Sequence, residues 1–261
     1  MNLDRAVIRD SPIHRADPRL KFVTTVVTIL AITLLPIGAF AALIVMWLAL
    51  SVASVVARLG PLRLSRAAFI AAPFLLAAVP LIFVRSGDPL GRIGPLTVSG
   101  EGLVIFATIA AKSWLSVQAA LLMTFTTPFH DLVDALRDLR LPRILVAIIG
   151  FMYRYLAVLG EEAVRMMRAR SARSAVAVGA TSGGSLGWRA RVTGQMVGSL
   201  FLRSYERSER IYAAMQSRGF DGSFRHLASQ RISRSAWLTF AVLIGGLVAF
   251  ELIGHVVLPH A

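Results

Sequence analysis

The sequence predicts an all-α polytopic membrane protein with about five transmembrane helices and a cytoplasmic helical domain that contains two long helices. Hydrophobic residues make up 56% of the 261 residues, and the mean hydropathy is +0.68, which is high for a soluble domain. Several apolar stretches approach the roughly 20 residues that a membrane-spanning helix needs. Residues 128–236 instead form a polar region, with 17 arginines against eight acidic residues.

The first two spans are predicted from one long apolar run. Residues 22–57 are too many for a single span, and Pro36 and Gly38 interrupt them. Proline removes a backbone hydrogen-bond donor, and glycine permits a turn. We therefore expect helices over 22–35 and 38–57, joined as a tight hairpin.

Three further apolar stretches complete the predicted set of spans. They cover residues 67–84, 102–125 and 237–258. We expect Pro73 and Pro80 to kink the first of them. Lys112 lies within the second, where an ammonium group is costly in lipid. Either it pairs inside an assembly, or that helix begins later than its apolar composition indicates.

Basic residues in the short loops predict the orientation of the chain. The first 21 residues contain five basic residues, and the loop 58–66 contains three arginines and no acid. The loop 85–101 is balanced, with two basic and two acidic residues. Because short cytoplasmic loops collect Lys and Arg, we expect the N-terminus and the polar region on the cytoplasmic side of the membrane and the C-terminus outside. The polar, partly acidic start does not fit a signal peptide.

The chain is accordingly expected to divide into three parts. Residues 1–127 would form an N-terminal membrane domain with four transmembrane helices. Residues 128–236 would form the cytoplasmic domain, and residues 237–261 the last transmembrane helix and the C-terminus.

The polar region is predicted to contain one short helix and two long ones. Residues 126–142 have the pattern of a short helix with Thr127 as its N-cap. A first long helix covers about 143–171. After a flexible linker at 178–187, a second covers about 188–218.

Three features of the long helices bear on how they pack. The first half of the first helix is almost as apolar as a membrane span, whereas its second half is charged. In that second half, Glu161 and Arg165 have the spacing and order of a favourable i,i+4 ion pair. In the second helix, Gly194 and Gly198 leave a bare patch where another helix could cross closely.

Each long helix ends on small residues and an arginine. The first ends on Ala169-Arg170-Ser171, and the second combines Ala214 with Ser217-Arg218-Gly219. An arginine at a helix tip can fork onto carboxylates or backbone carbonyls in the groove of a partner. Alternatively, each arginine merely complements the helix dipole, and Gly219 is an ordinary residue after a helix end. The repetition on two helices of similar length favours the partner-binding interpretation.

Three segments carry a resemblance to a known family. They are SPIHRADPRLKF (11–22), residues 126–173 beginning TTPFHDLVDALRDLRLPRI, and ERIYAAMQSRGFDG (209–222). Together they resemble the T component, or transmembrane scaffold, of energy-coupling factor (ECF) transporters. The portion YRYLAVLGEEAVRM is most similar to the cobalt-type CbiQ family.

The resemblance implies a scaffold that uses its two long coupling helices to join other subunits. The implied partners are two copies of an ABC-type ATPase in the cytoplasm, a CbiM-like substrate-binding membrane subunit and a small CbiN-like subunit. The implied ATPase-binding residues are Ala169, Arg170 and Ser171 on one helix and Ala214, Arg218 and Gly219 on the other. Ser171 stands where the commoner form of the motif has glycine, which leaves the turn at the first tip in doubt. The implied cargo is cobalt, with nickel or a vitamin as alternatives.

The sequence carries no chemistry of its own that would make the chain an enzyme. It has no cysteine, and it lacks the G-x-x-x-x-G-K-[ST] loop that binds ATP. Its five histidines form no metal-binding pair, so we expect no catalytic residue, cofactor or metal ligand. The arginines are interleaved with acids and apolar stripes, which does not suit nucleic acid. A conventional ABC permease subunit that lines its own pathway is the alternative, although the chain shows no similar halves.

Overall fold

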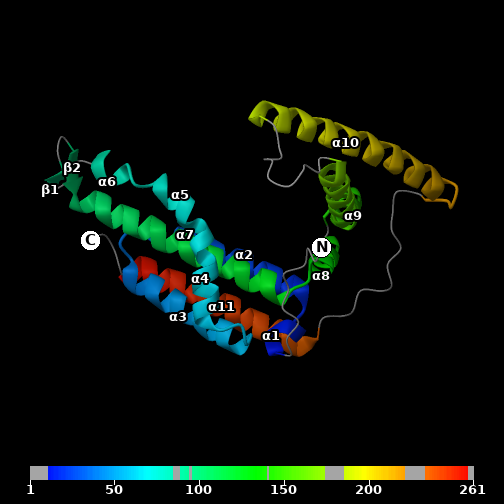
Figure 1. Cartoon of the computed structure of the whole chain (residues 1–261). Coiled ribbons are helices and arrows are strands. Elements are labelled where there is room, and N and C mark those ends of the chain that lie inside the picture. Colours follow the sequence, from blue (N-terminus) through cyan, green and yellow to red (C-terminus); the bar gives the residue numbers. More distant parts are fainter. Residues whose placement is uncertain are drawn as a thin grey trace. The chain divides into compact units, whose positions relative to one another are not determined.

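The computed structural model describes residues 11–84, 89–93, 96–139, 141–173, 185–220 and 233–257, and helices dominate it (Figure 1). The chain divides into two compact units. The elements of the larger unit are α1 (Pro12–Arg15), α2 (Pro18–Leu34), α3 (Phe40–Val56), α4 (Pro61–Ala67), the 3₁₀ helix η1 (Ala68–Ala71), α5 (Ala72–Leu76), α6 (Leu81–Val84), β1 (Pro89–Ile93), β2 (Leu96–Ser99), α7 (Gly100–Thr126), α8 (Phe129–Asp138) and α11 (Arg234–Val257). The smaller unit contains α9 (Arg143–Arg173) and α10 (Leu186–Gln216).

The predicted all-α membrane class is confirmed, with one small addition. The loop expected at 85–101 contains a short antiparallel hairpin in which β1 pairs with β2, for example Ile93 opposite Leu96. Residues 178–184 of the predicted linker lie outside the described residues.

The two helices predicted over residues 22–57 and the turn between them are present. Helix α2 ends at Leu34, and α3 begins at Phe40. Between them Gly38 has a φ of +85°, a left-handed conformation that side chains other than glycine rarely adopt. The Gly38 amide donates to Thr108 Oγ1 of α7 at 3.1 Å, which ties the turn to the neighbouring helix.

Lys112 has a role that the sequence did not reveal. Helix α7 begins at Gly100, so the lysine lies well inside it and a later start of this helix is excluded. The Lys112 ammonium donates to the carbonyl oxygens of Thr33 at 2.9 Å and Leu35 at 2.5 Å. Because the last carbonyls of a helix have no partner within it, the lysine caps the C-terminal end of α2. Its partners therefore lie within this chain.

The prediction of a single helix over 67–84 is wrong. Helix α4 begins early, at Pro61, and the chain then passes through η1, α5 and a turn before α6. Hydrogen bonds across this turn connect residues three apart, such as the Leu81 amide to the Ala78 carbonyl at 3.1 Å. Pro73 and Pro80 each lack the N–H that a continuous helix requires, so the chain breaks rather than kinks.

Fewer helices meet the length and composition of a membrane span than the five we expected. Among the described residues, α7 and residues Ile144–Arg173 of α9 each qualify. Helix α3 qualifies together with Pro61–Ala71 as a pair bent by 117°, which makes three spans if the pair counts as one. Helix α2 has 17 residues, and the apolar part of α11 is shorter, at Ala236–Ala249. The apolar half of α9 thus has the composition of a span, although we expected it in the cytoplasmic domain.

The larger unit has an apolar core and an apolar outer surface. Side chains such as Ile32, Leu43 and Leu115 are buried together where α2, α3 and α7 pack. On the outer side of α3, Val45 and Val52 are half exposed or more. Large apolar side chains exposed in this number would be costly in water, and they fit a surface covered by lipid. The chain is a multi-pass helical membrane protein.

Two polar segments that are distant in sequence meet in the larger unit. Arg19, in the first turn of α2, forms an ion pair of 2.6 Å with Asp138 at the end of α8. Lys21 donates to the carbonyl of Thr126 at the end of α7, at 3.1 Å. The segments 11–22 and 126–139, which carry part of the family resemblance, therefore form one folded junction.

Thr127 does not cap the short helix as predicted. Helix α8 begins one residue later than expected, with Pro128 at the N-cap position and no side-chain hydrogen bond there. The Thr127 hydroxyl is buried and has no hydrogen-bond partner among the described residues.

Candidate functional site

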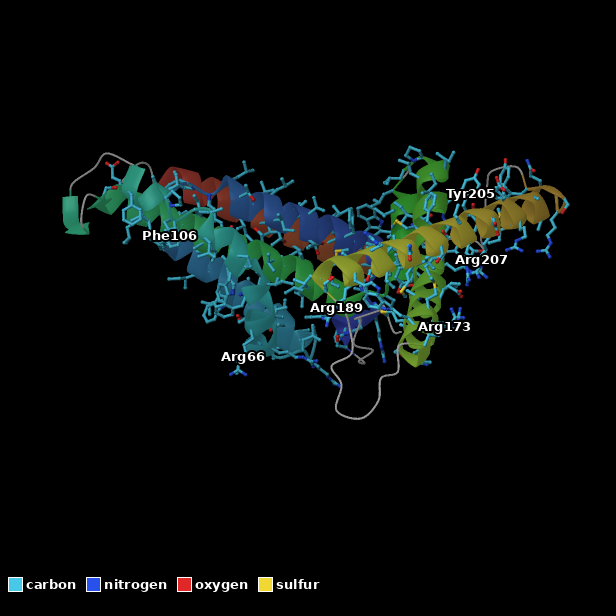
Figure 2. All side chains as sticks on the ribbon, turned by 45° about the horizontal axis from the view of Figure 1, so that its top comes forward. Arg66, Phe106, Arg173, Arg189, Tyr205 and Arg207 are labelled. Carbon is cyan, nitrogen blue, oxygen red and sulfur yellow. The ribbon has the colours of Figure 1, made fainter. Side chains whose placement is uncertain are left out.

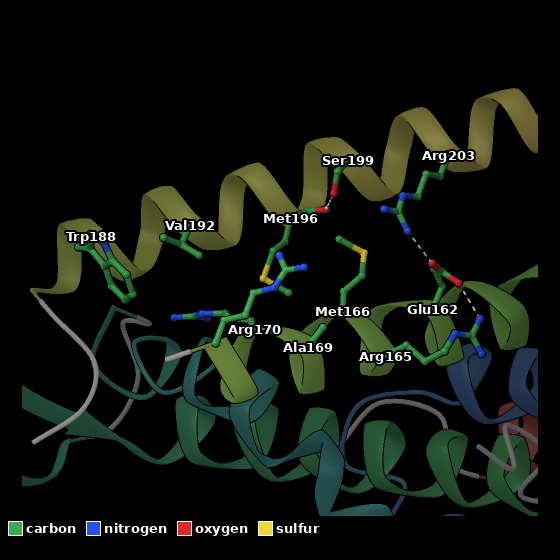
Figure 3. A pocket seen from close by; sticks show the side chains of 11 residues that line it. Glu162, Arg165, Met166, Ala169, Arg170, Trp188, Val192, Met196, Ser199 and Arg203 are labelled. Atoms are coloured by element: carbon green, nitrogen blue, oxygen red, sulfur yellow. Dashed lines mark hydrogen bonds and ion pairs between the residues drawn. The ribbon is translucent and has the colours of Figure 1, made fainter. Parts of the chain in front are cut away.

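The two long helices of the smaller unit, α9 and α10, are predicted to carry the partner-binding tips. Each has 31 residues, which corresponds to a length of about 46 Å. Later residues of α9 lie near earlier residues of α10, because Glu162 contacts Arg203 whereas Arg170 contacts Trp188 (Figure 3). The helices therefore run in opposite senses where they cross.

An ion-pair network marks the crossing. Arg203 Nη1 on α10 lies 3.1 Å from Glu162 Oε1 on α9, and Arg165 Nη2 lies 2.6 Å from Glu162 Oε2. The predicted partner Glu161 lies farther away, at 3.9 Å from Arg165, so Glu162 is the main partner of this arginine. The Glu162 carboxylate contacts one arginine on its own helix and one on α10, and these contacts lower its pKa. This carboxylate links the two helices.

A cavity lies on each side of this crossing. The first, of about 600 Å³, lies toward the end of α9 and the start of α10 (Figure 3). Its apolar lining includes Met166, Val192 and Met196. The second, of about 480 Å³, lies between the apolar half of α9 and the end of α10, with Phe151 and Met215 in its lining. The helices therefore diverge on both sides of the crossing.

The first tip does not form a turn. Helix α9 continues through Ser171 to Arg173, and the Ser171 hydroxyl donates to the Arg168 carbonyl of the same helix at 2.8 Å. The guanidinium carbon of Arg170 lies 5.7 Å from the ring centroid of Trp188, at the start of α10. Ala169 and Arg170 both line the first cavity.

The second tip has a sharp helix end. Gly219 has a φ of +76°, and its amide donates to the Gln216 carbonyl at 2.9 Å. The Phe220 amide donates to the Met215 carbonyl at 3.0 Å, which completes the Schellman pattern. Phe220 and Met215 both line the second cavity, as expected for the apolar contact of this motif. Arg218 directly precedes the left-handed glycine, and its side chain is exposed.

The two tips lie on opposite sides of the crossing. Arg170 is eight residues beyond Glu162, or about 12 Å along α9, and Arg218 is 15 residues beyond Arg203, or about 22 Å along α10. Because the helices run in opposite senses, Arg170 and Arg218 lie in opposite directions from the crossing. Figure 2 shows further arginines, including Arg173 and Arg207, extending from the same two helices. The arrangement can present two separate cationic ends to partners.

Sequence reasoning missed two residues that connect these helices. Glu162 was passed over because Glu161 has the i,i+4 spacing to Arg165, and Trp188 was regarded only as a helix start. The N-cap pattern at Ser185 was a usable signal, because the Ser185 hydroxyl accepts from the Trp188 amide at 3.3 Å. The close crossing expected at Gly194 and Gly198 is not found, since a Cβ at either glycine would meet no described atom within 4 Å.

The two tips carry groups that suit binding. Within the described residue ranges, no group of three or more His, Cys, Asp or Glu side chains could hold a metal ion. Each tip presents a guanidinium group, which suits recognition of carboxylates and carbonyls.

The fold defines a helical membrane protein. A family model described as cobalt transport protein, CbiQ, matches residues 9–229. The chain belongs to the CbiQ family.

Several relatives carry related names. The chain is 28% identical over 211 residues to the nickel permease LarQ of Lactiplantibacillus plantarum, a match that covers 80% of this chain and 69% of LarQ. It is 28% identical over 232 residues to the energy-coupling factor transporter transmembrane protein EcfT of Heliobacterium modesticaldum, with 85% of each chain covered.

The matched region spans a smaller part of other relatives. It covers about half (51%) of the uncharacterized protein MJ1571 of Methanocaldococcus jannaschii, at 28% identity over 59% of this chain. It covers 30% of a putative fused cobalt transport protein CbiMQ of Methanocorpusculum labreanum, at 27% identity over 68% of this chain. It covers 28% of a putative ABC transporter ATP-binding protein of Bifidobacterium longum, at 26% identity over 82% of this chain.

Proposed function

We propose that this chain is the transmembrane scaffold subunit of an ECF-type ABC importer. In this role it couples ATP hydrolysis by cytoplasmic ATPase subunits to a substrate-binding membrane subunit. The observation that carries the proposal is the pair of arginine tips on opposite sides of the α9–α10 crossing. Two tips that point apart suit two separate partner molecules better than they suit one shared pocket.

We propose that each tip docks in a groove of one ABC-type ATPase. Ala169, Arg170 and Ser171 form the first docking tip, and Ala214, Arg218 and Gly219 form the second. A guanidinium presents up to five N–H donors in a fixed fork, which matches carboxylates or clustered carbonyls at the bottom of a groove. The names EcfT and ABC transporter ATP-binding protein among the relatives support an ATPase partner.

The proposed coupling is mechanical. The two helices are rigid and linked at Glu162. A displacement of their tips therefore changes the angle at which they cross. The apolar half of α9, where Ile144 and Ile148 are exposed, then pushes on the substrate-binding subunit. A CbiM-like protein fits that role, since a CbiM–CbiQ fusion occurs among the relatives. A small CbiN-like subunit completes the proposed assembly.

The proposed cargo is cobalt, which another subunit selects. The family description supports cobalt, and the similarity to a nickel permease keeps nickel as the close alternative. The proposed location is the bacterial inner membrane, with the N-terminus and the coupling helices in the cytoplasm and the C-terminus outside.

The test is the double variant Arg170→Glu with Arg218→Glu. It reverses the charge at both tips, so we expect the ATPase subunits to be lost from the purified complex and uptake to fall to background. The protein should still accumulate in the membrane. The matched control is Arg168→Glu with Arg210→Glu, which makes the same charge change on exposed positions of the same helices. Normal ATPase copurification by the double tip variant would contradict the proposal.

A further inference from the structure

The first docking tip lacks the left-handed glycine that ends the helix at the second tip. Gly219 adopts a left-handed φ of +76° and ends α10 abruptly, which exposes Arg218. Ser171 remains inside α9, which continues to Arg173. Another feature of the structure must therefore set the direction of Arg170.

That feature is an aromatic ring supplied by the other coupling helix. The Arg170 guanidinium lies 5.7 Å from the centroid of the Trp188 ring, within the roughly 6 Å over which a cation–π interaction acts. Figure 3 shows the Arg170 side chain reaching from α9 toward α10, on the side of the cavity where Trp188 lies. The contact joins a residue of the first tip to the beginning of α10.

We propose that Trp188 is a positioning residue of the first docking tip and takes the place of the missing glycine turn. On this view Arg170 of α9 binds the first ATPase, and the ring of Trp188 from α10 holds its guanidinium in place. This inference rests on the proposed docking function of Arg170.

The position of the ring is fixed by local structure. Trp188 lies in the first turn of α10, and its amide donates to the N-capping hydroxyl of Ser185 at 3.3 Å. The ion pair of Arg203 with Glu162, 15 residues farther along α10, holds the two helices together at the crossing. These two contacts keep the indole within reach of Arg170.

The stacked arginine keeps its capacity to bind a partner. A guanidinium contacts an aromatic ring through its face and donates hydrogen bonds in its plane, so the two interactions do not compete. The apolar lining of the adjacent cavity, with Met166 and Met196, suits a partner that offers a carboxylate or carbonyl beside an apolar side chain.

The experiment measures the affinity of the purified chain for its ATPase in an Arg218→Glu background, where only the first tip is available. Trp188→Ala and Trp188→Leu should each weaken binding about two- to five-fold, the range of an exposed cation–π contact. Trp188→Phe, which keeps an aromatic face, should stay within about two-fold of the parent. The control Leu186→Ala removes an exposed apolar side chain from the same turn and should leave the affinity unchanged. Because Trp188→Leu keeps apolar bulk, it separates loss of the ring from loss of folding.

A double-mutant cycle with Arg170→Gln isolates the contact. Trp188→Leu should have little further effect once Arg170 is replaced, because the ring then has no guanidinium to position. Independent, multiplicative effects would overturn the inference, and so would unchanged or tighter binding by Trp188→Leu alone. If Arg170→Gln itself leaves binding unchanged, the proposed docking function fails instead. The two failures are therefore distinguishable.

Discussion

The tips of α9 and α10 carry the same residue in two different structural settings. Arg218 precedes a left-handed glycine at a closed helix end, whereas Arg170 lies inside a continuing helix beside an aromatic ring of the neighbouring helix. The end of the second tip thus follows from its own sequence, whereas the first tip has a contact between helices. If Trp188 positions Arg170 as proposed, a residue distant in sequence offsets a departure from a local motif, here Ser171.

The largest expected effect comes from the glycine of the second tip. Valine at position 219 would have to adopt a φ near +76°, where a side chain costs about 1–2 kcal/mol and a β-branched one more. We therefore predict that Gly219→Val weakens ATPase binding at the second tip at least about five-fold, measured in an Arg170→Glu background.

The matched control for this change is Ala172→Val, next to the first tip, in an Arg218→Glu background. This position is helical and exposed, so valine should alter binding by less than about two-fold. Equal losses from the two valines would remove the structural distinction between the tips.

An intermediate effect is expected at the crossing. Glu162→Arg places a third guanidinium beside Arg165 and Arg203, so α9 and α10 should separate where they are now linked. We expect uptake to be lost while ATPase copurification falls only a few-fold, because the second tip is intact and the first loses only its contact with Trp188.

Charge exchange provides the control for the crossing. Glu162→Arg combined with Arg203→Glu restores opposite charges between the helices and should recover part of the uptake, whereas Glu161→Arg should be milder. If the exchange recovers no uptake and Glu161→Arg reduces uptake as much as Glu162→Arg, Glu162 does not link α9 to α10.

The smallest effect is expected from restoring the commoner motif. Ser171→Gly places glycine in a helix that continues for two more residues, which costs roughly 0.5–1 kcal/mol of helix stability and supplies no turn. ATPase affinity at the first tip should change by less than about two-fold in a direct titration. A large gain in affinity would mean that the first tip also needs a turn, contrary to the role assigned to Trp188.

Features with a local cause were predicted well from the sequence. The turn at Gly38, the lengths of α9 and α10 and the glycine end of α10 each depend on residues that are adjacent or regularly spaced. The helix predicted over 67–84 failed because two prolines in an apolar run can either kink a helix or end it, and composition does not distinguish the two outcomes.

Contacts between elements could not be predicted from spacing. Lys112 caps α2 through carbonyls 77 and 79 residues away, and Glu162 bonds Arg203 across 41 residues. The six residues of the docking tips were chosen from sequence and resemblance, and their role in binding stays a proposal. The structure adds the information that the two tips lie on opposite sides of one crossing.

The most direct test of the two-tip account is cross-linking from each tip. The chain contains no cysteine, so Arg173→Cys and Ser217→Cys place single thiols beside the first and second tips. With a thiol-to-amine reagent, each single variant should attach one ATPase subunit, and the variant with both cysteines should yield one chain attached to two. Adding Arg218→Glu to the latter should abolish only the attachment at position 217. A variant with both cysteines that attaches only one ATPase, or the loss of both attachments with Arg218→Glu, would contradict the account.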